Sequence, residues 1–116
     1  MIGLDLVAIE RIRRLVDRHG EAALRRFLNP EEMAQTKAIE SIAGLWAAKE
    51  AVAKALGCGI GAKLSFHDIT IRKDAAGAPT AFLSDKAATF HGVNKLALSI
   101  THEKSHAAAV ALKVPL

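Results

Sequence analysis

The feature that most constrains the fold is the alanine-rich segment 46–56, which runs into the glycine-containing stretch 57–61. Ala, Leu, Lys and Glu favour a helix and glycine favours its C-terminal end, so the pattern predicts a helix over about residues 41–56. Glu50 and Lys54 lie one turn apart on one face of it. Because charges in a helix of Ala, Val and Leu are costly to bury, we expect this face to meet water, a metal ion or a charged ligand. We interpret the segment as an active-site helix.

The length and composition narrow the class of protein. A chain of 116 residues, 51% hydrophobic and 24% charged, is expected to form one domain spanning 1–116. It contains no apolar run near the roughly 20 residues that cross a bilayer. The start lacks the basic region of a signal peptide, and the single Cys58 excludes an internal disulfide. We therefore expect a cytoplasmic protein without a membrane partner.

Positive charge is concentrated near the start of the chain. Six of the seven arginines fall within residues 11–26, and the net charge is +4. A predicted helix over 9–19 places Arg11, Arg14 and Arg18 opposite an apolar stripe. This basic face is either solvated or a dock for an acidic protein helix. Tyrosine is absent and tryptophan occurs once, which argues against nucleic-acid binding through aromatic stacking.

The remaining patterns predict an α+β domain with helices mainly early and strands mainly late. Asn29, Pro30 and Glu32 form a capping box that begins a helix, and residues 2–8 alternate as a strand with Asp5 on the less apolar face. The other expected elements are helices at 22–27, 31–38 and between Ser84 and Gly92, and strands at 66–73, 80–83, 96–100 and 110–114.

The segment His102–His106 matches H-E-x-x-H, a zinc-protease motif. Two imidazoles at this spacing converge on a metal ion only in a helix. Here the flanking residues alternate with period two, which predicts a hairpin turn, and residues four apart in a strand are separated by about 13 Å. We expect the match to be accidental.

Two further patterns leave alternatives open. Glycines at 57, 59 and 61 favour either a loop that approaches a phosphate or a plain helix cap with a connection. Asp5 and Glu50 are carboxylates in apolar contexts, and such a pair suits Mg²⁺. Alternatively, Asp5 caps a helix or pairs with an arginine, and Glu50 bridges to Lys54.

Taken together, these residues resemble a known family, the small holo-acyl-carrier-protein synthases, which are short phosphopantetheinyl transferases. The resemblance covers nearly the whole chain. Its most specific parts are the Gly-x-Asp opening and the Lys-Glu-x-x-x-Lys helix, about 45 residues apart. The matching segments are Gly3-Leu4-Asp5, Glu10-Arg11-Ile12, Lys49-Glu50 with Lys54, Gly57 with Gly59, and Ser99-Ile100-Thr101-His102.

The resemblance implies a phosphopantetheinyl transferase fold, with helices packed on a small antiparallel sheet, and a homotrimer with active sites between subunits. The implied reaction moves 4′-phosphopantetheine from coenzyme A to a serine of apo-acyl carrier protein, in fatty acid biosynthesis. The implied roles are as follows: Asp5 and Glu50 bind Mg²⁺ or Mn²⁺, Glu50 and Lys54 are catalytic, Lys54, Gly59 and His102 bind coenzyme A, and Arg11, Arg14 and Arg18 bind the carrier protein.

The chain departs from this family at several positions. Leu45 stands where a basic residue that contacts a phosphate is common in the family, and Trp46 replaces the usual Phe. Cys58 and His106 replace the usual Thr and Tyr. The alternative of a different class is a non-catalytic basic module that binds an acidic protein or nucleic acid.

Overall fold

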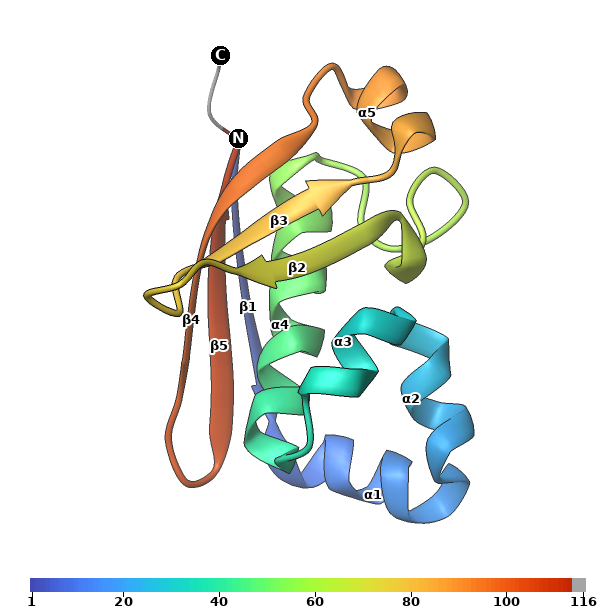
Figure 1. Ribbon diagram of the computed structural model, residues 1–116, viewed down its shortest axis with the longest axis vertical. Helices are drawn as coiled ribbons and strands as arrows, with labels where there is room; N and C mark the ends of the chain where they lie inside the picture. Colours follow the sequence, from blue (N-terminus) through green and yellow to red (C-terminus); the bar gives the residue numbers. More distant parts are fainter. Residues whose placement is uncertain (114–116) are drawn as a thin grey trace.

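An antiparallel sheet in the strand order β1-β5-β4-β3-β2 carries the long helix α4 on one face (Figure 1). This computed structural model describes residues 1–113. The strands are β1 (Ile2–Ala8), β2 (Ile69–Lys73), β3 (Pro79–Leu83), β4 (Lys95–His102) and β5 (His106–Leu112). The helices are α1 (Ile9–His19), α2 (Glu21–Phe27), α3 (Pro30–Gln35), α4 (Ile39–Ala55), α5 (Asp85–His91) and the 3-10 helix η1 (Phe66–Asp68).

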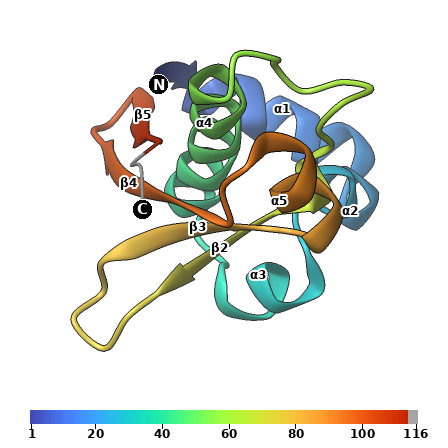
Figure 2. The same cartoon turned by 90° about the horizontal axis from the view of Figure 1, so that it is seen from above.

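The layers place α4 at the centre of the molecule. It packs against β1, β5 and β4, and α1 packs against it from the other side. Seen from above, α4 lies between the β4–β5 part of the sheet and helices α1 and α2 (Figure 2). None of the helices in residues 1–113 combines the length and the apolar character needed to cross a bilayer.

The α+β class and the antiparallel sheet are confirmed, and the differences are local. The helix expected over 31–38 ends at Gln35. The strand expected from residue 66 begins at Ile69, because Ser65 and Asp68 form a capping box and residues 66–68 fold as the helix η1. Val114, expected in the last strand, lies outside the described residues.

Strand β1 turns its apolar side away from the core. Ile2, Leu4 and Leu6 are each about two-thirds exposed (66%, 64% and 65%), whereas Gly3 and Val7 are buried under α4. A methyl group on Gly3 would lie 1.9 Å from the backbone oxygen of Ala51. Only glycine permits this close approach. The polar side of the strand, with Asp5, therefore faces the active-site helix.

The outward side of β1 continues into β5 as an apolar surface. Register pairs Ile2 with Leu112, Leu4 with Val110 and Leu6 with Ala108, and directly opposite residues share a face of the sheet. We call these six residues the outer apolar face. A contiguous apolar patch on a sheet is typical of a protein interface.

Lys49 does not share the face of Glu50 and Lys54 that was expected to meet water or a ligand, and its side chain is fully buried. Its Nζ donates to Glu32 Oε1 (2.7 Å) and to the carbonyl oxygens of Phe27 (2.8 Å) and Phe66 (3.2 Å). The other oxygen of Glu32 accepts from the Ile71 N–H at 2.7 Å. Burial lowers the pKa of Lys49, and Glu32 opposes that shift. A buried charge is tolerated here because its partners are complete.

Replacing Lys49 with methionine is expected to lower the free energy of unfolding by about 3–5 kcal/mol, because Glu32 is left buried without its counter-charge. Urea unfolding followed by circular dichroism measures this. The double variant E32Q/K49M should regain part of the loss, and the exposed control K63M should unfold like the parent protein. Equal stability of K49M and K63M would contradict the role given to the buried pair.

Candidate active site

A charged cluster lies where β1 meets the C-terminal half of α4. The Lys54 Nζ donates to Asp5 Oδ1 at 3.1 Å and to the Leu4 carbonyl oxygen at 3.0 Å. The Asp5 side chain is only 14% exposed, whereas Lys54 is about half exposed at 51%. Asp5 therefore pairs with a lysine of α4, and within residues 1–113 it neither caps a helix nor binds an arginine.

Glu50 is the third member of this cluster. Burial raises the pKa of Glu50 and the Asp5 carboxylate raises it further, while Lys54 and Arg11 act in the opposite direction. Within residues 1–113, no ion pair forms between Glu50 and Lys54, so the alternative of a one-turn bridge is not the arrangement found. Two neighbouring carboxylates with hard oxygen donors, only partly open to water, are a suitable pair for a divalent cation.

Arg11 lies next to this cluster and differs from the other two arginines of its stripe. Its Cζ lies 5.4 Å from the centre of the Trp46 ring, within the range of a cation–π contact. The same ring packs against Phe27 (5.1 Å) and Phe66 (5.0 Å). Arg14 and Arg18 are exposed on α1 as expected, and Arg14 lies 3.7 Å from Glu10. Spacing within α1 gave no signal of the Trp46 contact.

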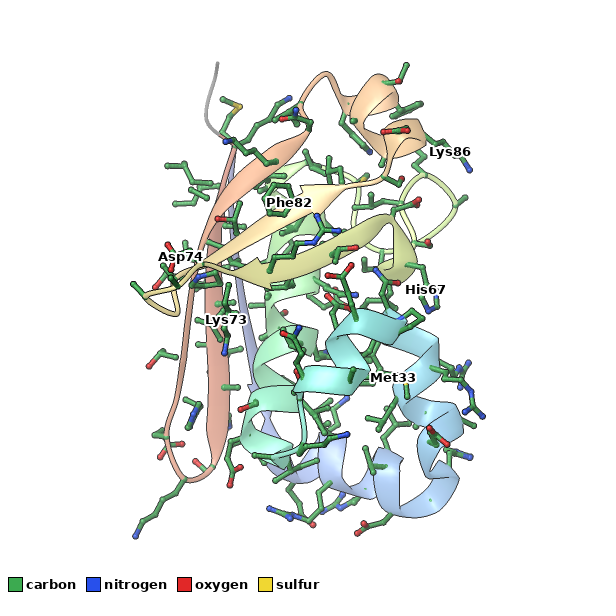
Figure 3. All side chains as sticks on the ribbon, in the orientation of Figure 1. Met33, His67, Lys73, Asp74, Phe82 and Lys86 are labelled. Carbon is green, nitrogen blue, oxygen red and sulfur yellow. The ribbon has the colours of Figure 1, made fainter. Side chains whose placement is uncertain are left out.

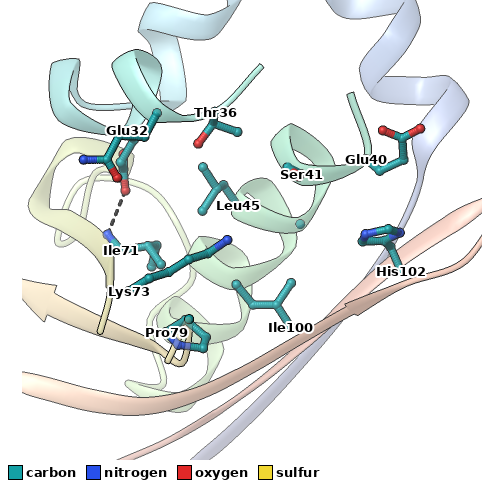
Figure 4. A pocket seen from close by; sticks show the side chains of 13 residues that line it. Glu32, Thr36, Glu40, Ser41, Leu45, Ile71, Lys73, Pro79, Ile100 and His102 are labelled. Atoms are coloured by element: carbon teal, nitrogen blue, oxygen red, sulfur yellow. Dashed lines mark hydrogen bonds between the residues drawn. The ribbon is translucent and has the colours of Figure 1, made fainter. Parts of the chain in front are cut away.

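A cavity of about 290 Å³ opens on the other side of α4, between α3, the β2–β3 hairpin and β4 (Figure 4). Its apolar lining includes Leu45, Ile71, Pro79 and Ile100. Its polar lining includes Glu40, Lys73 and His102. Of these lining residues, only two were singled out from the sequence. His102 was expected to bind coenzyme A, and Leu45 was noted as a departure from the basic residue common in the family. Lys73 carries no periodic signal and was missed.

The structure does not bring His102 to the charged cluster within one chain. Asp5 on β1 pairs with Ala109 on β5, and Ala109 pairs with Ile100 on β4. Asp5 and Ile100 are therefore two strand spacings apart, roughly 10 Å. His102 lies two residues further along β4, and α4 packs over the strands between. Asp5, Glu50 and Lys54 therefore form one group, and His102 belongs to the cavity.

The glycine segment acts as a helix cap. The N–H groups of Gly57, Cys58 and Gly59 donate to helix carbonyl oxygens of Lys54 (3.0 Å) and Ala53 (3.2 and 3.3 Å). Gly57 and Gly59 have positive φ angles of 78° and 66°, as such a cap requires. These N–H groups point back into α4, which favours the cap alternative over a phosphate cradle. The contact of Gly59 with coenzyme A stays a prediction.

The H-E-x-x-H segment forms the expected hairpin. His102 ends β4 and His106 begins β5. Glu103 Oε1 closes the turn by accepting from the N–H groups of Ser105 (2.8 Å) and His106 (2.7 Å). Hydrogen bonds from Ser105, above all from its hydroxyl, lower the pKa of Glu103 to about 2. Within residues 1–113, no group of three or more His, Cys, Asp or Glu side chains is arranged to hold a metal ion.

Comparison with known proteins gives a consistent result. A family model described as the 4′-phosphopantetheinyl transferase superfamily matches residues 1–111. The chain is 50% identical to the holo-[acyl-carrier-protein] synthase of Sulfurovum sp. (strain NBC37-1), over 95% of this chain and 92% of the relative. It is 53% identical to that of Campylobacter curvus (strain 525.92), over 97% of this chain and 98% of the relative.

Solved structures agree with the sequence relatives. The Helicobacter pylori holo-[acyl-carrier-protein] synthase in complex with coenzyme A superposes with a TM-score of 0.93 and 42% identity, covering 97% of this chain and 98% of that chain. The Plasmodium yoelii acyl carrier protein synthase with ADP bound superposes with a TM-score of 0.84 and 31% identity, covering 96% and 91%.

The pKa of Glu50 in the metal-free protein provides a test of the cluster. D5N should lower that pKa because a like charge is removed, and K54M should raise it because an opposite charge is removed. Carbon-13 NMR of the glutamate carboxyls against pH measures both. Because the folded pKa lies above 4.5, the Glu50 contribution to stability should fall as pH rises from 4.5 through that pKa. Shifts of the same sign in both variants would contradict the assignment.

Proposed function

The chain belongs to the 4′-phosphopantetheinyl transferase superfamily, and from that premise we propose how its residues carry out the transfer. The chain moves the 4′-phosphopantetheine group from coenzyme A to a serine of apo-acyl carrier protein, which gives the holo form and 3′,5′-ADP. We propose that this serves fatty acid biosynthesis in the cytoplasm. The observation that carries the residue assignment is the cluster of Asp5, Glu50 and Lys54 where β1 meets α4.

We assign the divalent cation to Asp5 and Glu50. Mg²⁺ is commonly held by one or two carboxylates together with substrate phosphates and water. The raised pKa of Glu50, caused by burial and by the nearby Asp5 charge, is the electrostatic sign of a site that favours a bound cation. Mn²⁺ has the same preference for oxygen ligands. The ion supplies charge neutralisation at the diphosphate oxygens.

Lys54 supplies the second positive charge of the site. Its ammonium group donates to Asp5 at 3.1 Å and its side chain is half exposed, so a ligand that enters the cluster can contact it. Phosphoryl transfer depends on positioning and on neutralising charge at the transferred and leaving groups. We assign Lys54 to the charge that develops on the 3′,5′-ADP leaving group.

The transfer is tested by incubating apo-acyl carrier protein with coenzyme A and Mg²⁺ and weighing the product by mass spectrometry. The parent protein should add the mass of one 4′-phosphopantetheine group. D5N and E50Q should each lower the rate by about 100-fold or more, since a catalytic cation contributes several kcal/mol. D85N, an exposed carboxylate on α5, is the matched control. Rates in D5N or E50Q close to that of D85N would refute the metal assignment.

The cavity beside His102 fits the nucleotide end of coenzyme A. Leu45, Ile71, Pro79 and Ile100 offer apolar surface for an adenine ring, and His102 offers a hydrogen-bonding group for a phosphate. The diphosphate must react at the Asp5–Glu50 cluster, which lies on the other side of α4. Because α4 packs over the strands between them, we propose that one coenzyme A molecule uses the cluster of one copy and the cavity of another.

The outer apolar face supports such an association. Its three β1 residues are each about two-thirds exposed, and covering apolar surface of this kind is the main driving force for assembly. We propose a homotrimer in which each active site is completed by a neighbouring copy. The cluster and the cavity then belong to different chains at every site.

Mixing two inactive variants tests this arrangement. D5N/E50Q and H102A, purified apart and assayed at low coenzyme A, should each show little transfer. Unfolding and refolding them together in equal amounts should restore about a quarter of the parent activity, because a quarter of randomly formed sites join two intact halves. Sedimentation should show a trimer for the parent and a smaller species for L4K/L6K. Absence of recovery in a mixed trimer would place each site within one chain.

The arginine face of α1 is the assigned dock for the carrier protein. Arg11, Arg14 and Arg18 lie on one exposed stripe, and Arg11 is adjacent to Glu50. An acidic helix bound there would present its serine near the cluster. Arg11 then joins the docking surface to the reacting groups, whereas Arg14 and Arg18 lie further along the helix.

A further inference from the structure

The cavity contains one strong cation whose role the assignments above leave open. Lys73 ends β2 (Figure 3), and it is the only lysine or arginine among the cavity-lining residues in the described part of the chain. Its side chain reaches across the cavity between Leu45 and Ile100 in the view of Figure 4.

The alternation of β2 separates Lys73 from its basic neighbour. Arg72 points to the other face of the sheet, where it donates to both oxygens of Glu31 at 3.0 and 3.1 Å. Lys73 shares its face with Ile71, which also lines the cavity. One arginine is therefore used for structure, and the adjacent lysine is directed at the cavity.

Lys73 has no internal counter-charge in residues 1–113. No carboxylate there lies within ion-pair distance of its Nζ. The nearest acidic residue in sequence, Asp74, uses its Oδ1 to accept from the N–H groups of Ala76 and Ala78, both at 2.9 Å. An exposed ammonium group in a cavity, with its neighbouring carboxylate occupied, is available to an anionic ligand.

The other charged residues that line the cavity are carboxylates, so Lys73 is the one available to bind an anionic ligand in the described part of the chain. The Glu32 carboxylate is bound to Lys49 and to the Ile71 N–H, and Glu40 lies on the His102 side of the cavity (Figure 4). Leu45, at the position that the resemblance makes basic, is buried and offers only apolar surface. Among the lining residues of the described part of the chain, the one fixed positive charge therefore lies on β2, and Leu45 of α4 supplies none.

We propose that Lys73 binds the 3′-phosphate of coenzyme A and replaces the cationic contact that Leu45 does not supply. The proposal rests on the nucleotide assignment made above for this cavity. The 3′-phosphate is the group concerned because the diphosphate must lie at Asp5 and Glu50, outside the cavity. A lysine serves a phosphate as a point charge, so a change of its position within the cavity is compatible with the same ligand.

Calorimetric binding of two nucleotides provides the test and requires no turnover. The parent protein should bind 3′,5′-ADP more tightly than 5′-AMP, which lacks the 3′-phosphate. K73M should weaken the binding of 3′,5′-ADP by about tenfold or more, the usual effect of losing a charged hydrogen bond. The affinity for 5′-AMP should stay unchanged. L45R/K73M should regain the preference for 3′,5′-ADP, and K86M, on α5 (Figure 3), should behave as the parent.

Equal weakening of both nucleotides in K73M would overturn the proposal, because Lys73 would then shape the cavity without reading the 3′-phosphate. Unchanged binding in K73M would overturn it as well. Steady-state kinetics distinguish failure of the Lys73 proposal from failure of the proposed function. K73M should raise the KM for coenzyme A with little change in kcat, whereas a parent protein that binds nucleotides and transfers nothing would refute the transferase assignment alone.

Discussion

The close contact of β1 with α4 is the constraint on which the rest of the molecule depends. Small residues allow it: Gly3 faces the backbone of α4, and buried alanines from α4 and β5 fill the interface, namely Ala47, Ala48, Ala51, Ala55, Ala107, Ala109 and Ala111. Larger side chains would hold the helix further from the sheet. Since Asp5 and Glu50 lie on either side of this contact, its depth determines how close their carboxylates lie to each other.

A second constraint fixes the rotation of α4 about its axis. Lys49 anchors the helix to the end of α2, to Glu32 of α3 and to the start of η1. Glu50, one residue later, points about 100° away and emerges beside Asp5. The adjacent charges of the Lys-Glu pair therefore have different functions, since one holds the helix in place and the other belongs to the site.

Much of this was predictable from the sequence, for identifiable reasons. Capping residues and period-two alternation predicted most elements, and the hairpin at 102–106 followed from its flanking strands. Periodicity did not predict which face of β1 is buried, because the more apolar face is the outer one. It also missed the burial of Lys49 and the Lys73 cavity contact, both of which depend on residues distant in sequence. The resemblance and the apolar contexts of the two carboxylates led us to group Asp5 with Glu50. The separation of His102 from that cluster could be seen only from the strand order of the sheet.

The aromatic contact of Arg11 has a spectroscopic consequence. Trp46 is the only tryptophan of the chain. Its indole packs against two phenylalanine rings that also contact each other, and a guanidinium group lies over it. Its emission therefore originates from one place, at the boundary between the arginine face and the acidic cluster. Movement of Arg11 toward an incoming acidic surface would change the polarity around that indole. The protein thus carries an intrinsic fluorophore beside Arg11, between the arginine face of α1 and the cluster of Asp5, Glu50 and Lys54.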